Sequence, residues 1–303
     1  TTACPAEDRR AEMRRLRGIL LSLLLLLVLA PGLEAQEEDR ERRLREQLAE
    51  PRPIAALNSV WIEELTWMEV RDALEAGKTT AIIPTGGIED NGPYLATGKH
   101  NYVLQTACEE IARKLGDALC APIVKLVPEG GIDEPSGHMR YPGTISLRQE
   151  TFRMVLSDVA RSLAAHGFRD VVFIGDSGGN QAGMEATARE LNRRWSDARA
   201  HYIPEYYDKA AVVEWMEEEL GIVQPVDEGL HDNYVITAEM MIADPTTVRY
   251  DQRVAAGRAS INGLSIVPEE RTIEIGRKLL GYRVDRTVEA IRAKRMERAS
   301  QGR

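Results

Sequence analysis

Short apolar runs alternate with amphipathic segments along most of the chain. Runs rich in β-branched and apolar residues predict buried strands at 79–84, 122–127, 171–174 and 201–207. Apolar residues at helical spacing predict helices at 102–115, 149–166, 182–195, 209–220, 233–241 and 270–293. Strands that are apolar throughout and alternate with helices are typical of a parallel sheet covered on both faces. We therefore expect an α/β fold, a three-layer α-β-α sandwich with a mostly parallel sheet.

The first helix of the folded part carries its own start signal. Thr66, followed three residues later by Glu69, forms a capping box, and Gly77 closes the helix at its C-terminal end. Residues 36–53 precede this helix and are dense in Arg and Glu without a cleanly repeating apolar face. For these residues we expect a solvated leader or a loose helix.

The N-terminal segment has the pattern of an export signal. From Met13, a basic stretch precedes an apolar run over 18–31 and small residues up to Ala35. Because this run is shorter than the roughly 20 residues that cross a bilayer, we expect cleavage after Ala35, a periplasmic or extracellular location and no stable membrane insertion afterwards. An uncleaved anchor over 23–27 is the alternative. The predicted organisation is an upstream extension and signal peptide (1–35), a charged leader (36–53) and one folded domain (54–303).

Composition and charge narrow the class of partner. The 303 residues are 43% hydrophobic and 29% charged, and their net charge of −9 is spread along the chain. No cluster of Lys and Arg with interleaved aromatic residues follows the N-terminal segment, which argues against a nucleic-acid partner and for a small molecule. After cleavage only Cys108 and Cys120 remain. Because Cys108 falls in an apolar helix pattern, we expect two buried, unpaired thiols rather than a bridge.

Two glycine-rich junctions follow predicted strands, at 85–93 and 175–180. Active sites in parallel sheets lie at the carboxyl ends of the strands, so side chains at these junctions are expected to share a cleft. Glu89 and Asp176, together with His100, would supply the carboxylates and imidazole that suit zinc or manganese. The alternative for Glu89 is a simple capping role at a turn.

The second junction also allows a serine nucleophile. Its Gly-Asp-Ser-Gly-Gly string is found around the serine of trypsin-like proteases, but the alternation of strands and helices excludes that all-β fold. Ser177 between a strand and a helix, with Asp227 and His231 downstream, is closer to a nucleophile elbow. No His-Gly-Gly-Gly loop precedes Ser177 to form the usual oxyanion hole.

Four blocks of the sequence, taken together, resemble the creatininase family. Residues 84–100 resemble the signature that runs from a strand end to a metal-bridging aspartate, and 137–146 resemble the His-x-x-Phe-Pro-Gly-Thr-Ile-Ser segment. Residues 174–180 resemble the Asn-Gly-His-Gly-Gly-Asn loop, and 228–237 the stretch that carries a substrate-directed histidine. The first three blocks keep the family's order and spacing, and the resemblance covers about 65–248.

The chain departs from the family pattern at the metal ligands. The resemblance implies ligands at five positions, of which only the first keeps its residue type: Glu89, Asn91, His100, Ser177 and Gly179. Asp176 lies one residue before the lost histidine and offers a new carboxylate. We therefore expect a changed metal site, built from Glu89, His100 and Asp176, with one or two ions.

The resemblance also suggests roles for the remaining candidates. His231 matches the family histidine and, with Asp232 beside it, would move a proton. The candidates for substrate binding are His138, Asn180, Lys99 and Asn91. For His138 a hydrogen-bonded structural role is the alternative, as is simple exposure for Lys99.

The function that the resemblance implies is that of a creatininase-like amidohydrolase. Such an enzyme would cleave a cyclic amide or a related C–N bond, or a C–C bond beside a carbonyl, in a small polar molecule, with a metal-bound water as nucleophile. The family also implies a homo-oligomer. Two alternatives stay open: a metal-free serine hydrolase that uses Ser177, and a non-catalytic exported small-molecule-binding protein.

Overall fold

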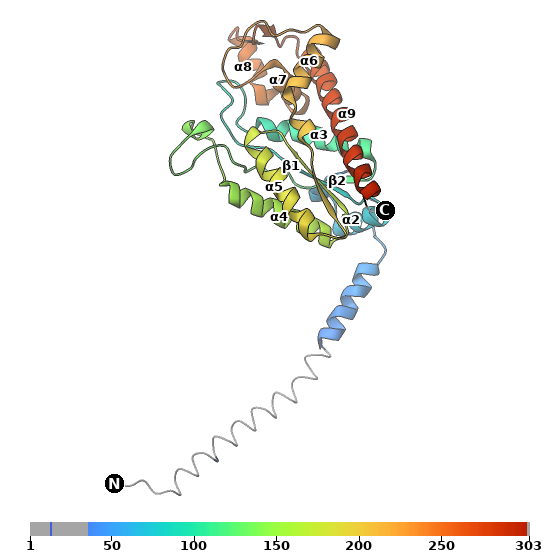
Figure 1. The fold of residues 1–303 in the computed structure, drawn as a ribbon. Coiled ribbons are helices and arrows are strands. Elements are labelled where there is room, and N and C mark those ends of the chain that lie inside the picture. The colour runs from blue at the N-terminus through green and yellow to red at the C-terminus, as the bar shows by residue number, and fades with distance from the viewer. Residues whose placement is uncertain (1–12, 14–35, 302–303) are drawn as a thin grey trace, which may run out of the picture. The chain divides into compact units, whose positions relative to one another are not determined.

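The computed structural model describes Met13 and residues 36–301 (Figure 1). Apart from Met13, the predicted signal sequence lies outside the described residues. The chain divides into two units, residues 1–55 and 56–303. In the first unit, residues 36–49 form an exposed helix in which Asp39 pairs with Arg42 and Arg43. Within the described part, no helix combines the length and the apolar content that a bilayer crossing requires.

A parallel four-stranded sheet forms the centre of the second unit. Its strands are β1 (Thr80–Thr85), β2 (Ala118–Cys120), β3 (Asp170–Gly175) and β4 (Arg199–Tyr202), in the order β2-β1-β3-β4. All three neighbouring pairs are parallel. Both β1 and β3 are buried along their whole length, as expected for the inner strands of a sheet covered on two faces. The predicted α/β sandwich is confirmed.

Two predicted strands are corrected by the structure, and proline explains both. The strand expected at 122–127 is wrong, because β2 lies at Ala118–Cys120 and only isolated bridges form at Val124 and Val127. Pro122 has no N–H to donate to the neighbouring strand. The strand expected at 201–207 ends at Tyr202, and Pro204–Tyr207 form a 3-10 helix instead.

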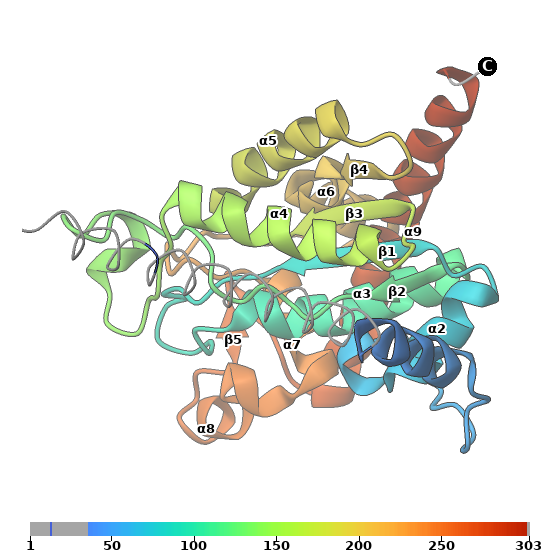
Figure 2. The ribbon, with the colours of Figure 1, turned by 90° about the horizontal axis from the view of Figure 1, so that it is seen from below.

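Helices cover both faces of the sheet (Figures 1 and 2). On one face α4 (Gln149–Ala165) and α5 (Gly178–Arg194) pack against Ile83, Val171 and Phe173. On the other, α3 (Lys99–Leu115), α7 (Tyr234–Ala243) and α9 (Glu269–Gln301) pack against Ile82 and Val172. Successive strand residues face opposite sides, so β1 and β3 each contribute to both cores. The remaining helices are α2 (Trp67–Glu75), α6 (Lys209–Leu220) and α8 (Tyr250–Ala255), and a short hairpin joins β5 (Ser260–Ile261) to β6 (Leu264–Ser265).

The predicted capping box at the start of α2 is confirmed. The Thr66 side chain accepts a hydrogen bond from the Glu69 backbone N–H, and the Glu69 carboxylate accepts one from the Thr66 backbone N–H at 2.7 Å. The same carboxylate also accepts a bond from the Leu57 N–H at 2.5 Å. Glu69 therefore fixes both the helix and the segment that leads into it.

The expectation of two unpaired thiols is wrong, because Cys108 and Cys120 form a disulfide. Cys108 lies on the inner face of α3 and Cys120 at the end of β2, with 6.2 Å between their Cα atoms. Both side chains are fully buried, as the apolar pattern predicted. The helix pattern around Cys108 indicated burial but not that this face packs on the strand carrying the second cysteine.

Candidate functional site

The site lies at the carboxyl ends of the two central strands. Beyond β1 the chain passes through Gly86 and Gly87 before it reaches α3, and β3 leads into Asp176 and α5. A Cβ at Gly86 would lie 1.9 Å from the Asn101 side-chain oxygen, and a Cβ at Gly87 would lie 2.1 Å from Glu129 Oε1. Only glycine leaves room for these polar side chains to approach the strand end.

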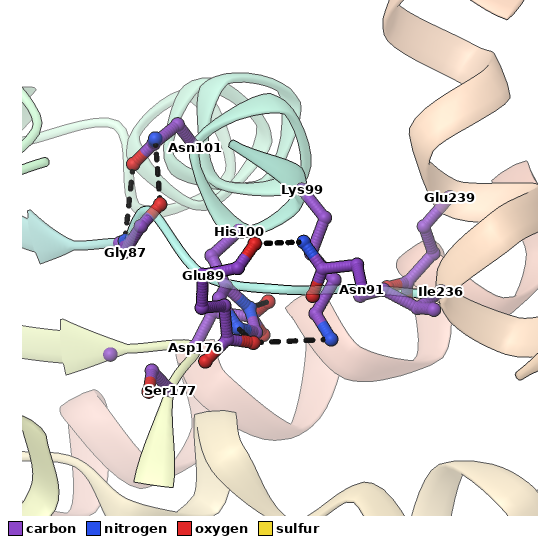
Figure 3. A network of polar contacts seen from close by, with 12 residues as sticks. Gly87, Glu89, Asn91, Lys99, His100, Asn101, Asp176, Ser177, Ile236 and Glu239 are labelled. Atoms are coloured by element: carbon purple, nitrogen blue, oxygen red, sulfur yellow. Dashed lines mark hydrogen bonds and ion pairs between the residues drawn. The ribbon is translucent and has the colours of Figure 1, made fainter. Parts of the chain in front are cut away.

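Three predicted ligands meet at this edge in one buried chain of contacts, the Glu89–His100–Asp176 triad (Figure 3). His100 Nδ1 lies 2.6 Å from Asp176 Oδ2, and His100 Nε2 lies 2.6 Å from Glu89 Oε1. All three residues are buried. Each ring nitrogen of His100 is therefore engaged by a carboxylate oxygen within this network. The structure therefore brings the three residues together as a hydrogen-bonded unit.

Arg283 completes the buried network behind the triad. It pairs with Asp176 and, through Nη1, with Glu239 Oε2 at 3.1 Å, while its Nε donates to the Tyr206 carbonyl at 2.8 Å. Burial would raise the pKa of Asp176, but the charges of Arg283 and His100 outweigh burial and hold the pKa below its usual range. Glu239 is buried as deeply, and since Arg283 is shared with Asp176, burial raises the pKa of Glu239 to about 7.

Glu89 is the centre of the polar contacts at this edge. Lys99 Nζ lies 3.2 Å from Glu89 Oε1 and donates to the His231 carbonyl at 3.1 Å. Burial would raise the pKa of Glu89, but His100 and Lys99 lower it well below the usual range. Glu129 behaves oppositely, because burial and the nearby charge of Glu89 raise its pKa to about 9.

A second set of donors, Glu89, His138 and His231, faces the solvent side of the triad. His138 Nε2 lies 3.6 Å from Glu89 Oε2, and His231 Nδ1 lies 3.8 Å from Glu89 Oε1. The two imidazole centroids are 4.3 Å apart. One ligand atom from each of the three residues fits within 4.8 Å of the others. All three line a cavity of about 960 Å³.

The backbone and hydrogen bonds of His231 hold it in this position. Its φ of +55° is in the left-handed region that non-glycine residues rarely adopt. Its Nδ1 lies 2.8 Å from the Asp90 carbonyl oxygen. A carbonyl only accepts, so Nδ1 carries the proton and Nε2 keeps a lone pair, the arrangement found for metal-bound histidines.

The donors of this second set fit one divalent ion. Two histidines and one glutamate are a known ligand set of catalytic zinc, which keeps a fourth position open. The 3.6 Å between His138 Nε2 and Glu89 Oε2 is close to the roughly 3.4 Å that separates tetrahedral ligand atoms bonded to zinc at about 2.0–2.2 Å. In the triad behind this set, both nitrogens of His100 already contact carboxylates. The family resemblance implies ligands at two further positions, but this chain has Asn91 and Ser177 there.

The other predicted site residues occupy distinct positions. Asn91 donates to the backbone oxygens of its own loop, and Asn180 Nδ2 donates to the Thr85 and Gly86 carbonyls at 3.1 and 2.9 Å, so both brace the strand end. Ser177 does lie between a strand and a helix, but its Oγ donates to Glu129 Oε2 at 3.2 Å. Among the described residues, no histidine nitrogen is a hydrogen-bond partner of that hydroxyl.

Three functional candidates were missed by the sequence reasoning: Glu129, Glu239 and Arg283. A signal was present for two of them. Glu239 interrupts the otherwise apolar end of α7, and Arg283 lies between the buried Leu280 and Val284 of α9. A charge in an apolar helix face is seldom buried without a partner, so the two residues could have been paired. Glu129 lies in a loop without a comparable pattern.

The fold and this edge define the class: a three-layer α/β protein with a buried polar site at the carboxyl ends of its central strands. A sequence model of the creatininase family, described as creatinine amidohydrolase, matches residues 63–291. The chain therefore belongs to the creatininase family, as the motif resemblance predicted.

Several known proteins show how far the similarity extends. The creatinine amidohydrolase of Pseudomonas putida is 28% identical over 137 residues, 44% of this chain and 52% of that protein. A mycofactocin precursor peptide peptidase of Mycobacterium ulcerans (strain Agy99) is 29% identical over 39% of this chain and 47% of its own length. The 3-dehydro-scyllo-inosose hydrolase of Thermotoga maritima is 27% identical over 39% of this chain and 36% of its own length. The matched segments thus span about half the length of the curated relatives, or less.

Solved structures support the fold over a longer stretch. A crystal structure of creatinine amidohydrolase (creatininase) matches with a TM-score of 0.58 at 22% identity, covering 78% of this chain and 98% of that one. A manganese form of creatininase matches with a TM-score of 0.58 at 23% identity and similar coverage, 78% and 99%. At these identities the likeness establishes the shared architecture.

Proposed function

We propose that this protein is a hydrolase that cleaves the C–N bond of a cyclic amide in a small polar molecule, using one divalent ion, zinc or manganese. The proposal places the ion at Glu89, His138 and His231. Family membership supports it, because the relatives that match are named for hydrolytic activities. The observation that carries it is a set of three donors within 4.8 Å of one another at the wall of the large cavity, the one such set among the residues that the structure describes.

An ion bound there would polarise the substrate carbonyl and lower the pKa of a water molecule. The protein's own part begins with the triad. Asp176 and Arg283 fix His100, and His100 fixes Glu89 Oε1, so Glu89 Oε2 is left facing His138. Support of this kind behind a ligand sets its orientation and typically affects metal affinity 10–100-fold.

Glu129 is the group best placed to move a proton in the proposed reaction. It lines the same cavity as Glu89, its Oε2 accepts from Ser177, and its Oε1 is buried without a partner. The family resemblance implied a proton-transfer role for His231 and Asp232, but in this proposal His231 binds the ion. Glu129 then gives the proton that the leaving nitrogen needs.

Export to an oxidising compartment forms part of the proposal. The buried Cys108–Cys120 disulfide supports it, because stable disulfides form in the periplasm and outside the cell and are rare in the cytosol. The basic and apolar segments before Ala35 are the sequence pattern that would direct the chain there.

Metal content and activity of the full chain, purified without chelator, test the proposal together. We expect close to one zinc or manganese per chain and hydrolysis of at least one member of a lactam and cyclic-ureide panel that includes creatinine. Glu89→Gln should lose both, whereas Asp251→Asn, a matched acid on the exposed side of α8, should keep both. Hydrolysis that is metal-independent and abolished by Ser177→Ala would replace the proposal with a serine hydrolase. A chain that holds no metal and hydrolyses no member of the panel would favour a non-catalytic binding protein.

A further inference from the structure

A second cavity, of about 400 Å³, lies beside the proposed reaction site. His231 and Lys209 line both cavities, so the two share a wall. The second cavity is built from the start of α6, the residues that lead into α7, α7 itself and Arg283 of α9. Its apolar wall includes Val212, Val235 and Ile236. A substrate bound at His231 therefore has room to extend into it.

Two carboxyl groups that line this cavity have oxygens without partners. Asp232 is 9% exposed, and neither of its carboxyl oxygens has a hydrogen-bond partner. Glu239 is 1% exposed, and its Oε1 is likewise unpartnered while Oε2 binds Arg283. Buried side-chain acceptors nearly always have a partner in native proteins. Three such oxygens at one cavity indicate that a donor from outside the chain binds there.

The cations around the cavity differ in how far they are already used. Arg283 is saturated by Asp176, Glu239 and a backbone carbonyl, and Lys99 contacts Glu89 and the His231 carbonyl. Lys209, at the shared wall, lies 4.9 Å over the Tyr207 ring and forms no salt bridge with any described residue. The second cavity thus offers a free ammonium at the shared wall and free carboxyl oxygens elsewhere in its lining.

This arrangement matches the two ends of an opened cyclic amide. Water adds to the amide carbonyl, the C–N bond breaks, and the atoms balance as one carboxylate and one ammonium joined by the former ring. We propose that the second cavity receives the amine end, with Asp232 and Glu239 accepting its N–H groups and Lys209 pairing with the carboxylate beside the reaction site. The proposal rests on the proposed function for the identity of the ligand, and it makes the substrate a lactam whose product is an amino acid.

Binding of small amines to the full chain tests this assignment without relying on turnover. The probes are n-butylamine, 4-aminobutyrate and butyrate, measured by ligand-observed NMR in choline chloride. Asp232→Asn and Glu239→Gln should each weaken n-butylamine binding at least tenfold and leave butyrate unchanged. Lys209→Gln should weaken 4-aminobutyrate but not n-butylamine. Asp251→Asn, which removes an exposed acid, should bind all three as the wild type does.

The controls separate this inference from the proposed function. Glu89→Gln should keep n-butylamine affinity within twofold even though metal is lost. A wild-type chain that binds the amine but holds no metal would support the amine site and contradict the proposed function. No binding of n-butylamine by the wild type, or unchanged binding in Asp232→Asn, overturns it. Asp232 has no partner to lose, so that variant should keep its fold. Abolition of amine binding when potassium replaces choline would assign the cavity to an inorganic cation, and would also overturn the inference.

Discussion

Two neighbouring regions of one strand edge differ in whether their polar atoms are satisfied. In the Glu89–His100–Asp176 triad, both carboxylates contact the His100 ring, and Arg283 pairs with the other oxygen of Asp176. Toward the two cavities, by contrast, Glu129, Asp232 and Glu239 each keep at least one buried oxygen without a partner. The satisfied region is built for rigidity, because breaking any member strands a buried charge. The unsatisfied region has free carboxyl oxygens that can accept hydrogen bonds from a ligand.

The contrast also shows how a family site can change without being erased. His100 stands where the resemblance implies a metal-bridging aspartate, and its ring links two acids as a cation would. In our proposal the ion lies further toward solvent, where Glu89 meets His138 and His231. The inner region then becomes the support for the outer one.

The largest effect is expected from removing the cation of the satisfied region. Arg283→Leu leaves Asp176 and Glu239 buried without their shared partner, so the free energy of unfolding should fall by about 3–5 kcal/mol. Chemical denaturation measures this. Arg286→Leu, one turn away, breaks a half-exposed pair with Asp208 and should cost less than about 1 kcal/mol. An equal loss of unfolding free energy in Arg283→Leu and Arg286→Leu would contradict the special role of the buried cation.

Substitution of the outer donors should remove activity while the fold remains. His138→Ala loses one of the two proposed imidazole ligands, and we expect bound metal to fall below one tenth and hydrolysis to fall more than 100-fold, about 3 kcal/mol of transition-state stabilisation. Thermal melting should stay within a few degrees, because His138 is partly exposed and has few contacts to lose. His166→Ala, at the exposed end of α4, is the matched control. A metal content unchanged in His138→Ala is the contrary result.

Stability should depend on pH through Glu239. Its folded pKa of about 7 lies above the ordinary value of 4.5, so the protonated form is favoured by folding. Its contribution is therefore complete below pH 4.5 and is lost as the pH rises through 7, a change on the order of 3 kcal/mol. Denaturation between pH 5 and 8 should show a shallower fall in Glu239→Gln than in the wild type. Parallel pH profiles of the two proteins would show that this carboxyl is not the cause.

The smallest effect is expected at Ser177. Its hydroxyl is held by Glu129 rather than by an imidazole, so Ser177→Ala should lower hydrolysis less than about threefold. Steady-state kinetics with the best substrate of the panel measures this. A loss of a thousandfold or more would instead mark Ser177 as a nucleophile.

The sequence predicted most of the fold and the strand edge at which the candidate site residues meet. Apolar runs placed β1 and β3 within a residue, and the 209–220 helix was predicted with the bounds that α6 has. Strand-end glycines directed attention to Glu89 and Asp176, which do share one edge. These features depend on local pattern, which the sequence carries directly.

The remainder depends on contacts between distant segments. Both nitrogens of His100 contact carboxylates because Glu89 and Asp176 approach the ring from the ends of two different strands. The sequence does not show that approach. The role of Arg283 needed the packing of α9 against α7, and the disulfide needed the packing of α3 against β2. Local periodicity indicates that such residues are buried, but not which partner they meet.

The position of the bound ion distinguishes the outer donors Glu89, His138 and His231 from the inner triad. Crystals of the full chain soaked in zinc, with data collected at the zinc absorption edge, locate the ion by its anomalous signal. We expect one peak at about 2.0–2.2 Å from Glu89 and from imidazole nitrogens of His138 and His231, with the His100 hydrogen bonds intact. A peak between Glu89, His100 and Asp176, or two ions at that edge, would contradict it.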